Sequence, residues 1–189
     1  MGRRFSKSLG RKTHANPQAC ISTLDEDEAL DFIDVMEVDP FLLILDQVQD
    51  PRNLGACLRS AEGAGVNLVI MPNDRTAGLT DVVRHVASGA AEFLPLARTR
   101  NLARFMKKLR EIGIRLIGTS DQASKNIFQA DLKGPVGLVV GAEESGIRRL
   151  TAENCDELIH IPMSGKVECL NVSVATGVCL FEVFRQKNM

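Results

Sequence analysis

The segment with the richest chemistry lies near the C-terminal end, at residues 161–177, with the sequence IPMSGKVECLNVSVATG. Its pattern predicts the end of an apolar strand, a polar loop that contains a glycine, and a helix that begins near Asn171 or Ser173. A loop between a strand end and a helix N-terminus offers unpaired backbone N–H and C=O groups in a concave place. Such groups can hold a nucleotide-like ligand without a glycine-rich phosphate motif.

Two earlier segments have the same strand–loop–helix setting. Residues 53–61 (NLGACLRSA) and 141–147 (GAEESGI) each follow an apolar run. In the first segment, Gly55 allows a close approach of the backbone at the helix start. Arg59 lies six residues after the first asparagine of that segment, on a helix face that can look back toward the loop. In the second segment, two glycines bracket Glu143. Three such loops that converge would form a site, which predicts an enzyme.

The elements that must position these loops alternate between strands and helices. Apolar runs of strand length occupy residues 41–46, 66–71, 114–118, 136–140 and 158–161, with a weaker candidate at 92–96. Helical spacing of apolar residues occupies 54–64, 80–87, 101–112 and 173–185. Strands that are apolar throughout indicate a sheet covered on both faces. The pattern therefore predicts an α/β fold, a parallel sheet with helices on both faces, whose ligands bind at the carboxyl ends of the strands.

Composition narrows the class of protein further. Of 189 residues, 44% are apolar and 25% are charged, which is typical of a globular domain. No run of 18 apolar residues and no secretory signal pattern occurs, so no membrane span is expected. The five cysteines form no C-x-x-C pair and the three histidines lack ligand spacing. We therefore expect a cytoplasmic protein with reduced thiols and no metal site.

The N-terminal 40 residues differ from the rest in charge. Residues 1–24 carry five basic and no acidic side chains, and residues 25–39 carry eight acidic and no basic ones. The basic part is either a contact for phosphates, with salt-sensitive affinity, or a solubilising arm. The acidic part predicts a short helix packed on the body. We therefore expect an N-terminal extension at 1–40 and a single α/β domain at 41–189.

Several common nucleotide and hydrolase motifs are missing from the sequence. It contains no G-x-x-x-x-G-K-[ST], no G-x-G-x-x-G that opens a helix, and no G-x-S-x-G. The run Gly63-Ala64-Gly65 predicts a helix end instead of a phosphate loop. These absences disfavour a P-loop nucleotidase, a dinucleotide-binding dehydrogenase and an α/β-hydrolase.

Taken together, the three loop segments resemble the SpoU (TrmH) family of SPOUT RNA methyltransferases. The matching residues are Asn53-x-Gly55-x-x-x-Arg59-Ser60-Ala61, Gly141-x-Glu143-x-x-Gly146-Ile147, and Ile161-Pro162-Met163-x-Gly165 followed by Leu170-Asn171-Val172-Ser173-Val174-Ala175. Each motif alone is weak, but three in order are specific, and the similarity covers about residues 41–187. The runs CDELIHIP and ATGVCLFE favour the branch that methylates a guanosine ribose 2′-OH in 23S rRNA.

The resemblance implies more than the residues show by themselves. It implies a SPOUT-type fold with a C-terminal trefoil knot, S-adenosyl-L-methionine as cofactor, RNA as substrate, and a homodimer. Carried over by motif position, the backbones of Gly141, Ile161 and Leu170 would contact the cofactor. The expected catalytic residues are Asn53, Arg59, Glu143 and Asn171.

The implied reaction sets requirements for these side chains. Methyl transfer to a ribose hydroxyl needs alignment, removal of a weakly acidic proton and stabilisation of oxyanion character. The resemblance gives Arg59 the role of general base, yet a guanidinium is effectively always protonated. Phosphate binding and stabilisation of the alkoxide fit Arg59 better. Asn53 and Asn171 suit ribose or loop backbone, and Glu143 suits the orientation of Arg59 or Asn53.

Each assignment has a simpler alternative. Asn53 and Asn171 can each cap a helix, and Glu143 can be a solvated loop charge; the combination with Arg59 favours the functional interpretation. Cys169 stands where the family usually has serine, and a thiol is a weaker hydrogen-bonding group.

The target of the reaction is also open at this stage. The 23S rRNA branch normally has a larger N-terminal RNA-recognition domain, so the basic arm or a partner protein would have to supply recognition here. Other hypotheses are a tRNA ribose 2′-O-methyltransferase, a non-catalytic RNA-binding dimer of the same fold, and an unrelated α/β enzyme for small molecules.

Overall fold

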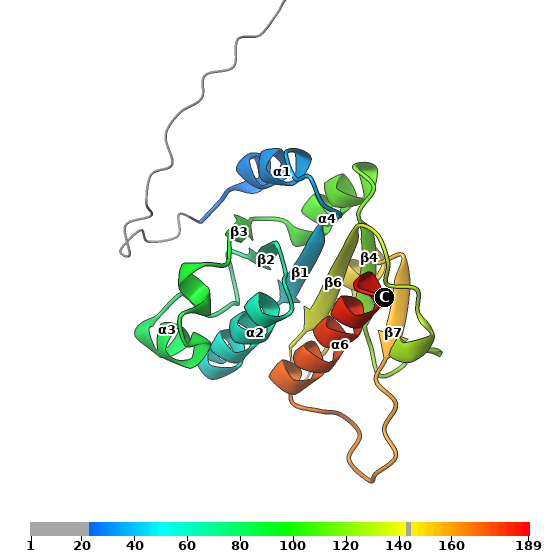
Figure 1. Cartoon of the computed structure of the whole chain (residues 1–189). Helices are drawn as coiled ribbons and strands as arrows, with labels where there is room; N and C mark the ends of the chain where they lie inside the picture. Colours follow the sequence, from blue (N-terminus) through cyan, green and yellow to red (C-terminus); the bar gives the residue numbers. More distant parts are fainter. Residues whose placement is uncertain (1–22, 143–144) are drawn as a thin grey trace, which may run out of the picture.

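The computed structural model describes residues 23–142 and 145–189 (Figure 1). Its strands form one seven-stranded sheet in the order β3-β2-β1-β6-β4-β7-β5, and each pair of neighbours is parallel. The strands are β1 Phe41–Asp46, β2 Leu68–Pro72, β3 Leu96–Thr99, β4 Arg115–Thr119, β5 Lys125–Asn126, β6 Val136–Gly141 and β7 Glu157–His160. The predicted parallel α/β fold is confirmed, while the basic residues 1–22 lie outside the described ranges.

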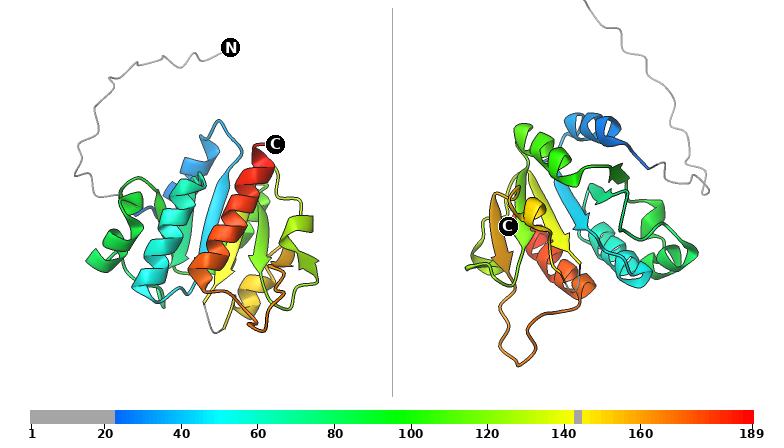
Figure 2. Two further views of the ribbon diagram at one scale, coloured as in Figure 1. Left: turned by 60° about the horizontal axis from the view of Figure 1, so that its bottom comes forward. Right: turned by 180° about the vertical axis from the view of Figure 1, so that it is seen from behind.

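Helices cover both faces of this sheet. They are α1 Glu26–Asp34, α2 Pro51–Gly63, α3 Asp81–Ala87, α4 Leu102–Glu111, α5 Arg149–Ala152 and α6 Val172–Lys187, with 3₁₀ turns η1 Ala90–Glu92 and η2 Ile127–Gln129. Helices α2, α3 and α6 lie on one face, and α1, α4 and α5 lie on the other (Figures 1 and 2). The short acidic helix expected before the domain is therefore present as α1.

The central strand β1 explains the apolar runs in the sequence. Leu43 and Leu45 point into the core under α2 and α6, whereas Leu42 and Ile44 point into the core under α1 and α4. All six residues of β1 are buried. A strand buried on both faces does not alternate apolar and polar residues, so its sequence is a nearly continuous apolar run.

One strand prediction is wrong, and two short elements were not predicted. Residues 92–96 do not form a strand, because Ser88 and Gly89 adopt positive φ angles of 51° and 89° and turn the chain into η1. Strand β3 begins only at Leu96. The unpredicted elements β5 and α5 have two and four residues, too few for a periodic pattern.

The chain leaves the adjacent strands β1 and β6 toward opposite faces. After β1 it enters α2, and after β6 it passes through residues 142–148 into α5, which packs against α4. This divergence creates a switch point, where open parallel sheets bind ligands. The loop between β7 and α6 projects from the same edge (Figure 1). The first of the three segments, residues 53–61, lies inside α2 and is not a loop. Its start and the other two segments share one edge of the sheet.

Helix α1 is fixed to the sheet by a capping box and by one edge bridge. The Asp25 side chain accepts hydrogen bonds from the backbone N–H groups of Asp27 and Glu28, both at 2.9 Å, and Glu28 accepts one from the N–H of Asp25. Leu24 forms a parallel bridge to Ala97 on the outer edge of β3. The acidic segment is thus part of the folded body.

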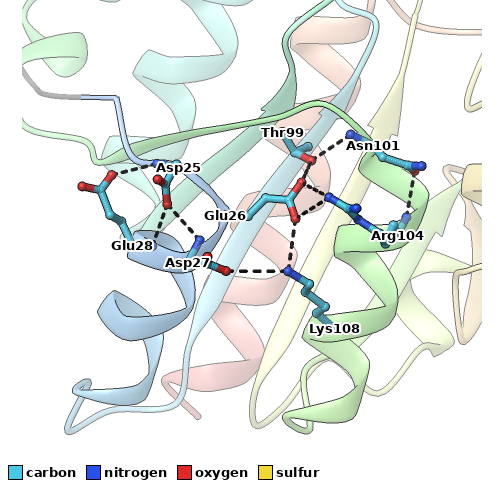
Figure 3. Close-up of polar contacts among 8 residues, drawn as sticks. All are labelled: Asp25, Glu26, Asp27, Glu28, Thr99, Asn101, Arg104 and Lys108. Carbon is cyan, nitrogen blue, oxygen red and sulfur yellow. Dashed lines mark hydrogen bonds and ion pairs between the residues drawn. The ribbon is translucent and has the colours of Figure 1, made fainter.

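Glu26 binds the start of α1 to β3 and α4 (Figure 3). Its carboxylate accepts a 2.6 Å hydrogen bond from Thr99 Oγ1 and 3.2 Å contacts from Arg104 and Lys108. Burial raises the pKa of this carboxyl, but the hydrogen bonds from Thr99, Lys108 and Arg104 outweigh burial and lower the pKa below its ordinary 4.5. The folded state therefore favours the ionised form.

We predict that Glu26→Gln lowers the free energy of unfolding by about 1–2 kcal/mol at pH 7, since hydrogen bonds to a charged group are lost. A lowered folded-state pKa stabilises the fold above the unfolded-state pKa, and this contribution is lost as pH falls through the folded-state value. The difference from wild type should therefore shrink at pH values well below 4.5. Urea unfolding at pH 7 and at acidic pH measures it.

Asp34→Asn is the matched control, because Asp34 is an exposed carboxylate at the other end of α1 and makes the same change in charge. It should leave stability at pH 7 unchanged or slightly higher, since a negative charge at a helix C-terminus is unfavourable. An equal loss in both variants would contradict the role given to Glu26.

Candidate active site

Asn53 lies inside α2, three residues after the helix cap. The cap is Asp50, whose carboxylate accepts a 2.7 Å hydrogen bond from the backbone N–H of Arg52, and Pro51 occupies the first helical position. The simpler alternative that Asn53 caps this helix is therefore wrong. Gly55 also acts differently from expectation, because a Cβ atom there would lie 2.8 Å from α3, so this glycine serves helix packing.

Asn171 is the N-cap of α6 and also the partner of Asn53. Its Oδ1 accepts hydrogen bonds from Ser173 N–H at 2.9 Å and from Ser173 Oγ at 2.6 Å. Its Nδ2 donates to Asn53 Oδ1 at 3.2 Å. Asn171 thus caps α6 and also contacts Asn53, so the capping role and a role in the site are compatible. This contact joins the first and third motif segments across 118 positions of sequence.

Arg59 lies apart from this asparagine pair. Six residues correspond to about 1.7 helical turns, so Arg59 faces away from the side of α2 that carries Asn53. Its side chain is exposed, and no hydrogen bond or ion pair to it occurs among residues 23–142 and 145–189. Gly63, one turn further on the same face, packs near the ring of Phe181. The structure therefore brings Asn53 and Asn171 together, but not Arg59.

The second motif segment depends on close contact between two glycines. A Cβ atom on Gly141 would collide with the backbone of Gly146 and Ile147. Ala142 and Gly146 exchange backbone hydrogen bonds of 3.1 and 2.9 Å, and Gly146 has a φ angle of 61°. Only glycine suits both positions, which explains their spacing. Glu143 lies outside the described residues.

A buried ion pair that the sequence did not reveal fixes the far end of this segment. Asp46, the last residue of β1, is completely buried. Its carboxylate accepts hydrogen bonds from the Arg148 backbone N–H at 3.0 Å and from Nε at 2.8 Å, and Nη2 lies 2.7 Å away. The available signal was an acidic residue that ends an otherwise apolar strand. Its partner lies 102 positions away.

The third motif segment offers its backbone to a ligand. Ile161 directly follows β7 and Leu170 directly precedes the cap of α6, and both are half-buried, whereas residues 162–169 are exposed. Within the described chain, residues 162–170 make no backbone hydrogen bonds. Gly141 ends β6 at the same edge of the sheet. These groups suit a ligand held through the main chain, while the cofactor contacts expected of Gly141, Ile161 and Leu170 stay a prediction.

The thiols have ordinary structural environments. Cys57 and Cys179 are buried, Cys155 is half-buried and Cys169 is exposed. Burial raises the pKa of Cys179 to about 12, which makes it a poor nucleophile at neutral pH. Among the residues that the structure describes, no three His, Cys, Asp or Glu side chains gather as metal ligands. No described helix is long and apolar enough to cross a membrane.

Comparison with known proteins defines the class of this fold and site. The model of the SpoU rRNA Methylase family matches residues 40–181. The chain therefore belongs to the SpoU rRNA Methylase family, and the recognition made from the three motifs is confirmed.

Two curated relatives carry a more specific name. The 23S rRNA (guanosine-2′-O-)-methyltransferase RlmB of Ralstonia nicotianae is 53% identical over 175 residues, which cover 93% of this chain and 69% of that protein. The protein of the same name from Pectobacterium atrosepticum is 60% identical over 148 residues, which cover 78% of this chain and 61% of that protein. The chain thus spans about two thirds of the length of these relatives.

Solved structures with the same fold include two with bound cofactor. The SpoU methyltransferase AviRb from Streptomyces viridochromogenes, in complex with AdoMet, has a TM-score of 0.75 and 28% identity, covering 83% of this chain and 64% of that chain. The AdoMet-bound rRNA methyltransferase from Sinorhizobium meliloti has a TM-score of 0.75 and 30% identity, covering 82% and 59%.

We predict that Asn171→Ala lowers the free energy of unfolding by about 1 kcal/mol, because α6 loses its cap. Asn171→Asp keeps a capping oxygen and should stay within about 0.5 kcal/mol of wild type. Urea unfolding of both variants at one protein concentration measures these differences.

A double-mutant cycle with Asn53→Ala isolates the contact between the two amides. The loss in the Asn53→Ala/Asn171→Ala double variant should be smaller than the sum of the single losses by about 0.5–1 kcal/mol. Additive losses would show that the amide contact contributes nothing to stability.

Proposed function

We propose that this protein transfers a methyl group from S-adenosyl-L-methionine to a ribose 2′-OH of RNA, and that its target is a guanosine of 23S rRNA. The observation that carries the proposal is the Asn171–Asn53 hydrogen bond, which joins two motif segments of a SpoU family member at the carboxyl edge of its sheet. The two RlmB relatives support the choice of RNA and nucleotide. We place this reaction in the cytoplasm, where rRNA is available as a substrate.

The division of the chain is part of the same proposal. Residues 41–189 form the methyltransferase domain, and residues 1–40 form an extension whose basic part contacts RNA. The chain spans about two thirds of the length of its RlmB relatives. The choice of the particular nucleotide is assigned by analogy with these relatives.

Two main-chain regions would hold the cofactor. The exposed backbone groups between Ile161 and Leu170 supply donors and acceptors without internal partners among the described residues. Gly141 lets the backbone of the second segment approach closely. When bound, S-adenosyl-L-methionine supplies an electrophilic methyl group on its sulfonium. The C-terminal trefoil knot implied by the family resemblance would shape this pocket.

The asparagine pair positions the ribose. Asn171 Oδ1 is occupied by the cap of α6, and its Nδ2 fixes the side-chain orientation of Asn53. A fixed amide restricts where a hydroxyl can lie, and alignment of reacting groups accounts for a large share of catalysis in transfer reactions. For Glu143, which lies outside the described residues, the proposed role is to orient Asn53 or Arg59.

Arg59 stabilises negative charge and does not act as a base. A guanidinium remains protonated at neutral pH, so it binds the neighbouring phosphate and favours the developing alkoxide. Its exposed position on the outer face of α2 leaves it available to a second molecule.

In a homodimer, this second molecule would be another copy of the chain, which would lie next to Arg59. On the outer side of α6, Val174, Phe181 and Phe184 are 52%, 50% and 43% exposed, at helical spacing. The two phenylalanine rings pack edge to face with centroids 6.1 Å apart. Phe181 also lies over Gly63, one turn from Arg59. A second copy that covers this apolar stripe would meet Arg59 at its border.

We predict that Arg59→Ala reduces methyl transfer by about 10²–10³-fold, the usual cost of removing a group that stabilises an oxyanion. Arg59→Lys should also be strongly impaired, because an ammonium lacks the planar fork of a guanidinium. The measurement is transfer of labelled methyl from S-adenosyl-L-methionine to unmodified rRNA and, separately, to unmodified tRNA.

Lys107→Ala removes an exposed cation on α4 and serves as the control with full activity. If label appears on tRNA alone, the proposed substrate changes from rRNA to tRNA. Absence of cofactor binding in titration calorimetry would contradict the enzymatic function and leave a non-catalytic RNA-binding protein.

We predict that wild type is a dimer by sedimentation equilibrium and that Phe181→Glu is a monomer with little methyl transfer, because a buried carboxylate is strongly unfavourable in an apolar interface. Phe93→Glu changes an even more exposed phenylalanine, at 77%, and should remain dimeric. A monomeric wild type, or a dimeric Phe181→Glu, would refute the proposed interface.

A further inference from the structure

A basic pocket of about 500 Å³ opens at the same edge of the sheet as the asparagine pair, but on the side of α4 and α5. The ends of β1 and β2, the first turn of α4 and the start of α5 line it. Four arginines contribute to the lining, and among the lining residues that the structure describes the one acidic side chain is that of Asp74. The arginines are Arg75, Arg100, Arg148 and Arg149. This pocket has no role in the cofactor and ribose contacts assigned above.

Two of the four guanidiniums make no ion pair with the residues that the structure describes. Arg148 is paired with Asp46, and Arg149 is paired with Glu153. Arg75 and Arg100 are exposed, and neither makes a hydrogen bond or an ion pair within residues 23–142 and 145–189. Within the described residues, the lining of the pocket therefore carries a surplus of positive charge.

The loop that carries Arg75 is held rigidly in place. Arg98, from β3, donates hydrogen bonds to the carbonyl oxygens of Pro72 at 3.2 Å and Ala77 at 3.0 Å. Backbone bonds of Asn73 N–H to Thr99 at 2.8 Å and of Ala77 N–H to Val48 at 3.0 Å fix both ends of the loop. Arg75 itself adopts a positive φ of 56°. These hydrogen bonds fix the backbone that carries the Arg75 side chain before a ligand binds.

The opposite wall offers further groups suited to an anion. Helix α4 has ten residues, and its N-terminal residues Leu102 and Ala103 line the pocket. The positive end of a helix dipole and its unpaired N–H groups favour a negative ligand. Arg148 keeps its place through Asp46, while 44% of its side chain remains exposed. Cations from three separate segments thus surround one space.

We propose that this pocket binds a phosphodiester of the RNA strand that carries the methylated ribose, with Arg75 and Arg100 as the residues that contact phosphate. The inference rests on the proposed function and adds a substrate-positioning site to it. Guanidiniums match phosphate oxygens in a bidentate geometry. Asn53 lies on α2, and the pocket is lined by α4 and α5 on the other face of the sheet (Figure 2), so an RNA strand that contacts both would cross the carboxyl edge of the sheet.

The test compares Arg75→Gln/Arg100→Gln with Lys107→Gln/Lys133→Gln, which removes two exposed cations elsewhere and changes net charge equally. Filter binding of labelled, unmodified 23S rRNA at several KCl concentrations is measured for both variants and for wild type. The arginine variant should bind about tenfold or more weakly, and its salt slope should fall by about one unit for each lost phosphate contact. The lysine variant should bind like wild type.

Two further measurements separate this inference from the proposed function. Cofactor binding by calorimetry should be unchanged in the arginine variant, and in methyl transfer its KM for rRNA should rise more than its kcat falls. Equal affinity and equal salt slope in the two double variants would overturn the pocket assignment, even where wild type methylates rRNA. A wild type that transfers no methyl, but whose rRNA binding is lost in the arginine variant, would support the pocket and refute the enzymatic function.

Discussion

The buried contact between Asp46 and Arg148 is the constraint on which both halves of the site depend. Removing a carboxylate from water is costly unless it is paired and hydrogen-bonded, and Arg148 supplies both its backbone N–H and its guanidinium. The pair sits where the chain leaves β1 and β6 toward opposite faces. It therefore fixes Arg148, directly before α5, against the end of β1. The asparagine pair on one side and the arginine pocket on the other are both placed relative to this junction.

Structural and chemical roles coincide in the same side chains at this edge. Asn171 caps α6 through Oδ1 and orients Asn53 through Nδ2. Gly141 and Gly146 allow a backbone contact that no other residue permits, and this contact shapes the second motif segment. A loss of activity on substitution there reports on both roles together. This is why the tests above pair each variant with a measurement of stability, cofactor binding or a matched control.

The sequence predicted the sheet and the three loops because each rests on a local pattern. Strands such as β1 are buried on both faces, so their apolar runs are easily recognised, and the motif segments lie between these runs and the helices that follow. What it did not predict depends on contacts between distant positions. The partner of Asp46 and the orientation of Arg59 follow from how segments far apart in the chain pack. Arg75 and Arg100 belong to no repeating sequence pattern, and only the folded structure shows that they line the same pocket.

The net charge of −1 does not describe the surface that RNA would meet. On the α4 side, Glu26 pairs with Arg104 and Lys108, Asp27 also pairs with Lys108, and Asp156 binds Arg110. The acidic helix α1 thus cancels cations away from the site. Uncompensated guanidiniums remain at the carboxyl edge, where the pocket opens. Because screening confines electrostatic attraction to about 10 Å at ordinary salt, a polyanion responds to this local surplus and not to the net charge. An overall nearly neutral chain can therefore direct an RNA strand to one edge of its sheet.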